Sequence, residues 1–137
     1  MSWAQSLVRL STYEVEVLQK RMGEIAARRA DAQMRLIMLS AEAEAEAETA
    51  QANAEAGWYH IGFMDGVRAR KAAIEAELAE IALEEQGARD ALSGAFEEQK
   101  KYEQVAEDIR LTRLRETARK EAAVMDEMGL RRTAAGR

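Results

Sequence analysis

The chain of 137 residues contains no cysteine and no proline, and aromatic residues make up only 5% of it. Without cysteine it can form neither a disulfide nor a thiolate metal site. Without proline, no residue forces a helix to break. The chain also lacks an apolar run of the length that a membrane-spanning helix needs. Residues 1–4 are not a basic segment leading into a long apolar run, so we expect no signal peptide.

The formal net charge of −5 is small for this length and argues against general binding of nucleic acid. The sequence shows no glycine-rich phosphate loop, no nucleophile–base pairing and no ligand cluster. The single histidine, His60, has no ligand residues at a suitable spacing. We therefore expect a protein that is not an enzyme, with no catalytic, cofactor or metal site. The expected location is the cytoplasm, with at most peripheral association with the inner face of the cell membrane.

Charged residues make up 33% of the chain, and apolar residues recur in two stretches at alternating steps of three and four. This spacing is the signature of a coiled-coil seam. Arg29 interrupts the first stretch and Glu85 the second, and we expect them to pair across the seam. The first seam is Leu18, Met22, Ile25, Arg29, Ala32, Leu36, Leu39 and Ala43. The second is Val67, Ile74, Leu78, Ile81, Glu85, Ala88, Leu92, Ala95, Gln99, Tyr102, Ala106 and Ile109.

Three glycines, Gly57, Gly62 and Gly66, separate the two stretches. Glycine favours helix ends, so we predict an all-α protein, a two-helix antiparallel coiled-coil hairpin with a longer C-terminal helix. The single domain 1–137 should contain helices over about 3–55 and 66–130, a turn over about 56–66 and a frayed tail over 131–137. A turn near 57–60 places Leu39 close to Leu78. One continuous helix in a parallel dimer, kinked at the glycines, is the alternative.

Residues 41–56 alternate alanine with mostly glutamate, and both are strong helix formers. The seam there is thin, and the glutamates form either a solvated face or an acidic surface for a basic partner. Trp58, Tyr59 and Phe63 either cover the end of the seam or remain exposed as an anchor for a partner.

Beyond residue 110 the second helix has no upstream residues left to pair with, so residues 112 to about 130 should project alone. Its basic residues would allow binding to a membrane surface, but its apolar face is thin and has no aromatic residue, which favours docking of a protein. The candidate partner-binding residues of the whole chain are Trp58, Tyr59, Phe63, Arg113, Leu114, Arg119, Met125, Asp126 and Glu127.

The chain resembles the FliJ family of flagellar type III export proteins, especially the form found in alphaproteobacteria. The segments that carry the resemblance are residues 7–10, 13–14, 68–73, 100–103, 121 and 125–127. The resemblance implies a coiled coil similar to the stalk subunit of rotary ATPases. It implies a linker between the export ATPase ring and the membrane export gate, with export chaperones as further partners. The paired termini would enter the ring, and the part nearer the turn would face the gate. A generic coiled-coil scaffold or homodimerisation module is the alternative.

Overall fold

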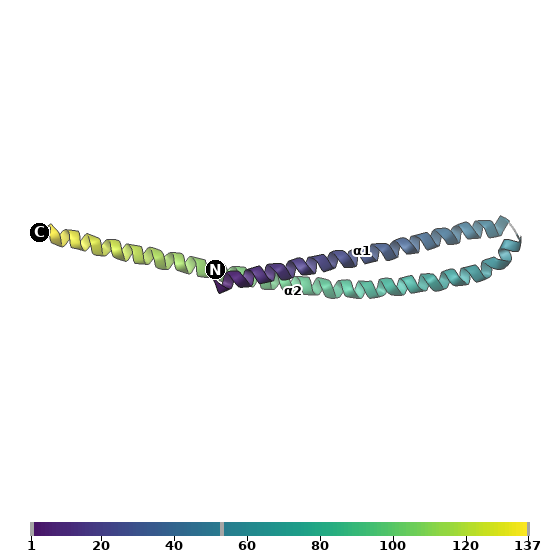
Figure 1. The fold of residues 1–137 in the computed structure, drawn as a ribbon, viewed down its shortest axis with the longest axis horizontal. Coiled ribbons are helices and arrows are strands. Elements are labelled where there is room, and N and C mark those ends of the chain that lie inside the picture. The colour runs from purple at the N-terminus through teal and green to yellow at the C-terminus, as the bar shows by residue number, and fades with distance from the viewer. Residues whose placement is uncertain (1, 53, 137) are drawn as a thin grey trace. The chain divides into compact units, whose positions relative to one another are not determined.

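The computed structural model describes residues 2–52 and 54–136, and for residues 54–57 it describes the backbone only. Two helices, α1 (Trp3–Ala52) and α2 (Ala54–Ala135), pack against each other (Figure 1). No strand occurs in the described part of the chain. This confirms the predicted all-α hairpin with a longer C-terminal helix, and it replaces the alternative of one continuous helix.

The start of α1 is closed by a reciprocal pair of hydrogen bonds. The backbone N–H of Gln5 donates to Ser2 Oγ at 3.2 Å, and the backbone N–H of Ser2 donates to Gln5 Oε1 at 3.1 Å. A capping box of this kind satisfies amide groups that have no partner within the first turn of a helix.

The turn expected over residues 56–66 is wrong, because these residues belong to α2, which begins at Ala54. No described glycine has a positive φ, so Gly57, Gly62 and Gly66 do not act as helix stops. Each helical glycine costs about 1 kcal/mol relative to alanine. Packing offsets that cost, since Phe63 and Met64 lie against a buried cluster that includes Leu39 and Ala43 of the facing helix. The expectation failed because tertiary packing overrode local preference.

The prediction of a frayed tail over residues 131–137 is also wrong for residues 131–135, because α2 continues to Ala135. Arg131 Nη2 donates to Glu127 Oε1 at 2.9 Å, one helical turn earlier. Thr133 Oγ1 donates to the Gly129 carbonyl at 3.0 Å. Good helix formers and an ion pair at a spacing of four residues support the helix to this point.

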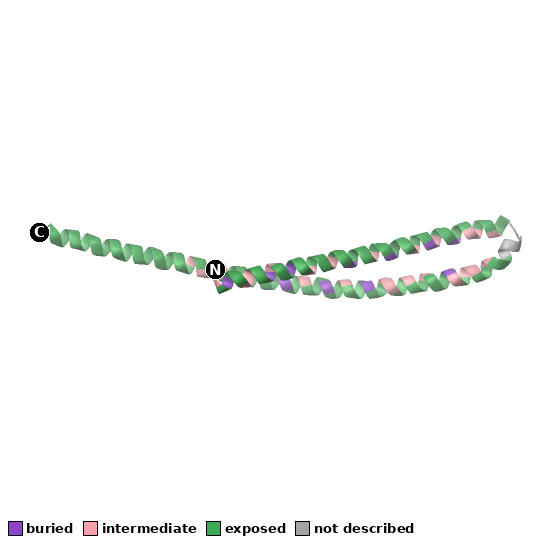
Figure 2. Cartoon of the chain, viewed as in Figure 1, coloured by how far each residue is buried: buried purple, intermediate pink, exposed green. Residues whose placement is uncertain are grey.

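The chain divides into two compact units, each containing part of both helices. Unit 1 consists of Met1–Val15 and Gly94–Arg137, and unit 2 is Glu16–Ser93. In unit 2 the first buried cluster is Ile25, Ala32, Ile81 and Ala88, with Met22, Ile74 and Leu78 packed against it. The second is Leu39, Ala43 and Val67, with Phe63, Met64 and Ile74 packed against it. Figure 2 shows these buried positions along the facing sides of the helices. The predicted seam is therefore confirmed in unit 2.

The register in unit 2 differs from the expected one by about one helical turn. Leu39 packs with Val67 and Ile74, whereas Leu78 packs with the other cluster. The cause is the position of the break between the helices, which comes earlier in the chain than the glycines indicated. The expected pairing of Arg29 with Glu85 is nevertheless confirmed.

The seam of unit 1 is built from small and polar residues. Ala4, Ser11, Val15 and Ala95 are all buried. Ser11 Oγ donates to the Val8 carbonyl at 2.9 Å, so the buried hydroxyl is satisfied. Across the seam, Gln99 Nε2 donates to Thr12 Oγ1 at 3.1 Å. Small side chains let the helices approach closely, and the polar pair ties residue 12 to residue 99.

Candidate partner-binding surfaces

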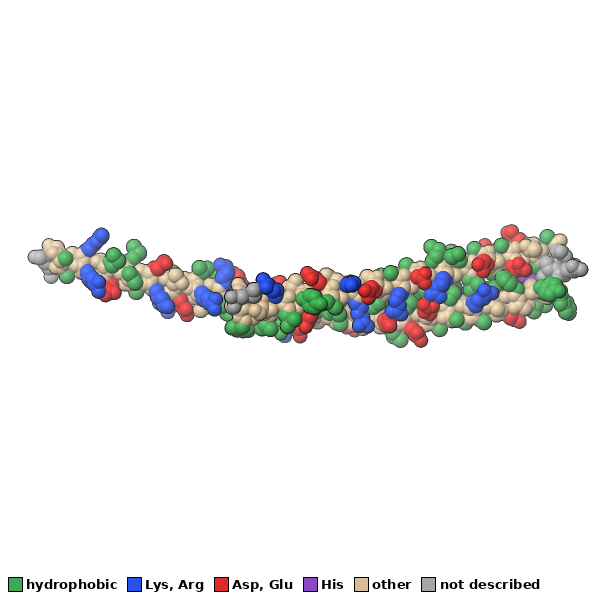
Figure 3. All heavy atoms as spheres, viewed as in Figure 1, with side chains coloured by type: hydrophobic (Ala, Val, Ile, Leu, Met, Phe, Trp, Pro, Cys, Tyr) green, Lys and Arg blue, Asp and Glu red, His purple; other side chains and the backbone are tan. Residues whose placement is uncertain are grey.

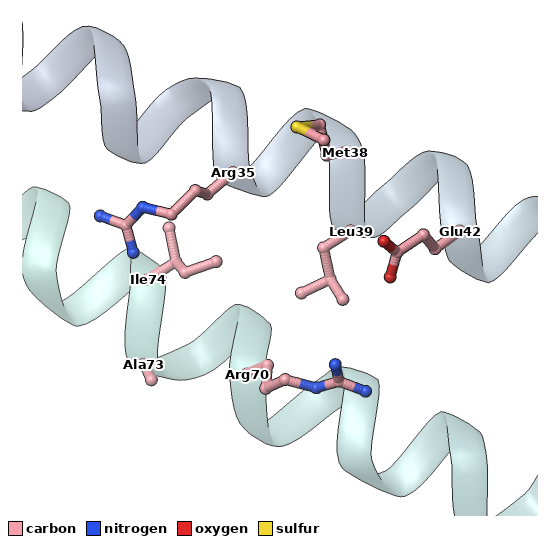
Figure 4. A pocket seen from close by; sticks show the side chains of 7 residues that line it. All are labelled: Arg35, Met38, Leu39, Glu42, Arg70, Ala73 and Ile74. Atoms are coloured by element: carbon pink, nitrogen blue, oxygen red, sulfur yellow. The ribbon is translucent and has the colours of Figure 1, made fainter.

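A hollow of about 410 Å³ lies between α1 and α2 within unit 2 (Figure 4). We call it the α1–α2 groove. Its residues are Arg35, Met38, Leu39, Glu42, Arg70, Ala73 and Ile74. Leu39 and Ile74 project into the space between the two helices in Figure 4. Aliphatic side chains therefore make its floor, and Met38 and the charged side chains make its edges.

The seam sequence explains why the groove forms at this place. After Leu39 the next seam residue of α1 is Ala43, which is small and buried. On α2 the residues between Val67 and Ile74 that lie nearest the seam are Arg70 and Lys71. Long basic side chains carry their charged ends out to water. Between Val67 and Ile74, α2 therefore has no large apolar side chain to fill the interface, and a hollow remains.

One basic residue at the groove is fully engaged with carboxylates. Arg35 Nη2 donates to Glu77 Oε1 at 2.8 Å, and Arg35 Nε donates to Asp31 Oδ2 at 3.1 Å. The hydrogen bond to Glu77, and then the one to Asp31, raise the pKa of the Arg35 guanidinium above its ordinary value. Arg35 therefore has little capacity left for a partner.

Two other charged residues of the groove are free of ion pairs. Neither Glu42 nor Arg70 pairs with an opposite charge among the described residues. Arg70 Nε makes only a long hydrogen bond, 3.4 Å, to the Gly66 carbonyl of its own helix. Figure 4 shows Glu42 on the α1 wall and Arg70 on the α2 wall at the same end of the groove. The two walls thus carry unpaired charges of opposite sign.

An exposed apolar stripe borders the groove on α1. Met34, Ile37 and Met38 are 55%, 63% and 57% exposed. Ile37 and Met38 lie three and four residues after Met34, which places all three on one side of the helix. Met38 also lines the groove. Sequence reasoning missed these residues and the groove, because it considered mainly the seam. The available signal was a group of large apolar residues outside the seam positions.

The structure separates the three aromatic candidates of unit 2. Trp58 and Tyr59 are 80% and 74% exposed, and Ile61 beside them is 70% exposed. Phe63 is half-buried against the Leu39 cluster. The exposed-anchor interpretation thus fits Trp58 and Tyr59, and the seam-covering one fits Phe63.

The alanine–glutamate run is helical in α1 up to Ala52. Glu42, Glu44, Glu46 and Glu48 make no ion pair or hydrogen bond with the part of the chain that the structure describes. The Glu55 side chain lies outside the described residues. The run therefore places unpaired carboxylates on two sides of α1, with Glu42 and Glu46 on the side that adjoins the groove.

In unit 1, every residue from 112 to 136 is exposed. We call residues 112–135 the C-terminal segment. Figure 3 shows hydrophobic, basic and acidic side chains interspersed along it. Its exposed large apolar residues are Leu114, Val124, Met125, Met128 and Leu130. These apolar side chains thus have no covering element among the described residues of unit 1.

The remaining candidate residues all belong to this segment. Arg113 and Leu114 line a hollow of about 220 Å³ with Ser2 and Gln5, so the start of α1 lies beside them. Glu127 pairs with Arg131 at 2.9 Å. The other candidates, Arg119, Met125 and Asp126, are exposed, and neither Arg119 nor Asp126 has an ion pair with a described residue.

Among the described residues, no group of three or more histidines or acidic residues is placed to hold a metal ion. Neither α1 nor α2, over its described residues, has a stretch apolar enough to cross a membrane.

Comparison with known proteins identifies similar chains in one organism. The chain is 50% identical over 134 residues to the flagellar FliJ protein of Caulobacter vibrioides strain NA1000 / CB15N, covering 98% of this chain and 96% of that protein. The flagellar FliJ protein of strain ATCC 19089 / CIP 103742 / CB 15 matches with the same identity and coverage. No protein-family model matches the chain, and no solved structure matches it.

Proposed function

The chain belongs to the FliJ family of flagellar proteins, and from this we propose that it is a non-enzymatic component of flagellar type III protein export. In this proposal it contacts the export ATPase through unit 1 and the membrane export gate through unit 2. Export chaperones are its further partners. The observation that carries the proposal is 50% identity to the flagellar FliJ protein of Caulobacter vibrioides over 134 residues, which cover 98% of this chain and 96% of that protein.

The C-terminal segment supports the assignment of the ATPase contact to unit 1. Met125 and Met128 are exposed on the segment and lie on one side of it, since they are three residues apart. An apolar helix face that its own protein leaves uncovered is a common place for a partner to bind. Arg113 and Arg119 add basic side chains that lack partners within the described chain.

The α1–α2 groove and the exposed Trp58 and Tyr59 support the assignment of the gate contact to unit 2. Aromatic side chains are enriched among the residues that dominate binding energy at interfaces. A groove with an apolar floor can bury the anchoring side chain of a partner. Both features belong to the part of the hairpin nearer the break between the helices.

Two full-length variants test the assignment. In capture on immobilised export ATPase, Met125→Asp/Met128→Asp should lower recovery at least about tenfold, because two charges replace a buried apolar contact. The matched variant Met34→Asp/Met38→Asp should be recovered like the wild type. Equal recovery of all three proteins would remove the C-terminal segment from the ATPase contact. Recovery of none would argue against the ATPase as a partner.

A coiled-coil scaffold is the second candidate, and the same segment favours it. Leu111, Leu114, Ala118, Met125 and Met128 follow heptad spacing, so two copies could pair through these residues. Sedimentation equilibrium separates the two functions. A mass of 15.3 kDa supports the export component, whereas a stable dimer that Met125→Asp/Met128→Asp dissociates supports the scaffold.

A further inference from the structure

The α1–α2 groove carries more information than its apolar floor. Glu42 on the α1 wall and Arg70 on the α2 wall are unpaired and lie at the same end of the groove (Figure 4). The other charged residue of the groove, Arg35, is held by Glu77 and Asp31. The free charges that an occupant meets are therefore negative on one side and positive on the other.

We propose that the groove binds an amphipathic helix of a partner protein. A large aliphatic side chain of that helix enters the hollow between Leu39 and Ile74. A basic residue on one flank faces Glu42, and an acidic residue on the other flank faces Arg70. We assign this helix to the gate protein. Only that assignment rests on the proposed function.

The shape and chemistry of the groove favour a helix over other occupants. Its walls are two antiparallel helices, and a third helix can lay its apolar residues between them. A helix presents no free backbone edge for an added strand, because its own backbone groups are already paired. Met38 on the rim, with Met34 beside it, is flexible and polarisable and adapts to a partner's surface.

Charge argues against a membrane as the occupant. Glu42, Glu44, Glu46 and Glu48 follow one another along α1 without a basic residue between them. Anionic headgroups attract basic segments and would be repelled by this row. Glu46 lies four residues after Glu42 on the same side of α1, so it gives the basic flank of a docked helix one further carboxylate to approach.

The two kinds of contact have different effects on binding. Exposed ion pairs contribute little affinity individually. They suppress wrong partners and fix orientation, because a like charge placed opposite is unfavourable. Insertion of the aliphatic side chain supplies most of the affinity. Among ligands that share one apolar face, the binding affinity should therefore depend on the charges of the two flanks.

Three synthetic helical peptides with one shared apolar face test the proposal. The first has one basic and one acidic flank, the second has two basic flanks, and the third has two acidic flanks. Each is labelled and titrated with the full-length chain while fluorescence anisotropy is recorded. The first peptide should bind several-fold more tightly than the others. In Glu42→Lys both walls are basic, so the peptide with two acidic flanks should then bind best.

Met38→Asp should weaken all three peptides at least about tenfold, because it places a charge at the apolar rim. Met38 is 57% exposed, so this change should leave the hairpin folded. The matched variant Leu83→Asp, at an exposed residue of α2 outside the groove, should bind like the wild type. Equal affinity of the three peptides, an unchanged order in Glu42→Lys, or equal loss in Leu83→Asp would each overturn the proposal. A second copy seated in the groove would appear as a dimer in sedimentation and would also overturn it.

Binding of the gate protein's cytoplasmic domain distinguishes this proposal from the proposed function. If Met38→Asp and Glu42→Lys alter the peptides as expected but leave gate binding unchanged, the groove chemistry holds and the gate assignment fails. If Met38→Asp abolishes gate binding while the three peptides bind alike, the assignment holds and the charge proposal fails.

Discussion

Arg29 and Glu85 form an ion pair across the seam, in which Arg29 Nη1 donates to Glu85 Oε2. The other carboxylate oxygen of Glu85 accepts from Arg89 Nη2 at 2.8 Å. The Glu85 side chain is only 15% exposed, whereas that of Arg29 is 43% exposed. Arg28 and Glu84 pair one residue away on both helices. The Arg29–Glu85 pair occupies polar positions within an apolar seam, which is a common way of fixing the register of a coiled coil. The Arg28–Glu84 pair lies at the exposed edge of that seam.

Replacing Glu85 by alanine should lower the free energy of unfolding by about 1–3 kcal/mol, because a half-buried guanidinium loses its partner. Urea denaturation followed by circular dichroism measures the change. The double variant Arg29→Met/Glu85→Leu should recover most of the lost stability, since an apolar pair can replace a seam ion pair. A double variant as unstable as Glu85→Ala would show that the ion pair contributes to the free energy of unfolding as well as fixing the register.

Ile81 is fully buried in the first cluster of unit 2, whereas Leu83 is 76% exposed on the same helix. Ile81→Ala should lower the free energy of unfolding by about 2–4 kcal/mol, through lost apolar burial and the cavity left behind. Leu83→Ala is the matched control and should change it by less than about 0.5 kcal/mol. The two urea midpoints are compared directly, and coincident midpoints would contradict the assigned seam.

Glu107 accepts two hydrogen bonds from Arg110, at 2.9 and 2.6 Å. The hydrogen bond from Arg110 lowers the pKa of Glu107, and the same bond raises the pKa of Arg110. A lowered pKa in the folded state means that the pair stabilises the helix above the ordinary glutamate pKa, and that this contribution is lost as pH falls through the lowered pKa. The effect should be small because both groups are exposed.

The unfolding midpoints of wild type and Glu107→Gln should therefore differ at neutral pH, with the wild type the more stable. The difference should shrink as the pH falls below about 4 and disappear in stronger acid. Urea titrations at several pH values measure it. A difference that persisted after Glu107 is protonated would show that the effect of the substitution does not come from this ion pair.

The alanine–glutamate part of α1 should open more readily than the rest of the helix. Ala43 is the last buried residue of α1, and the described residues beyond it are exposed or half-buried. Small side chains bury little apolar area per turn, so local opening there costs less free energy. Amides of residues 44–52 should exchange with deuterium faster than those of residues 22–39. Uniform exchange along α1 would argue against a thin seam.

The sequence predicted those features that depend on periodicity. Ile25, Ala32, Ile81 and Ala88 were assigned to the seam by their spacing alone, and they form its core. The Arg29–Glu85 pair followed from polar residues at matching seam positions. Periodicity is reliable here because one apolar stripe on each helix accounts for most of the burial.

Features that depend on the balance between local preference and packing were not predicted. Glycine marked a turn over residues 56–66, but packing of Phe63 and Met64 keeps that segment within α2. The α1–α2 groove depends on which small and charged residues meet across the interface. The groove could therefore not be predicted, because the register expected from the sequence differs from the observed one by about one helical turn.

We propose that this chain contacts an export ATPase through unit 1 and the export gate through unit 2. Recovery of the gate protein's cytoplasmic domain on immobilised export ATPase, with and without this chain, tests both contacts at once. We expect recovery only when the chain is present. We also expect loss of recovery with either Met125→Asp/Met128→Asp or Met38→Asp. Equal recovery without the chain, or release of the chain from the ATPase by the gate domain, would contradict this proposal.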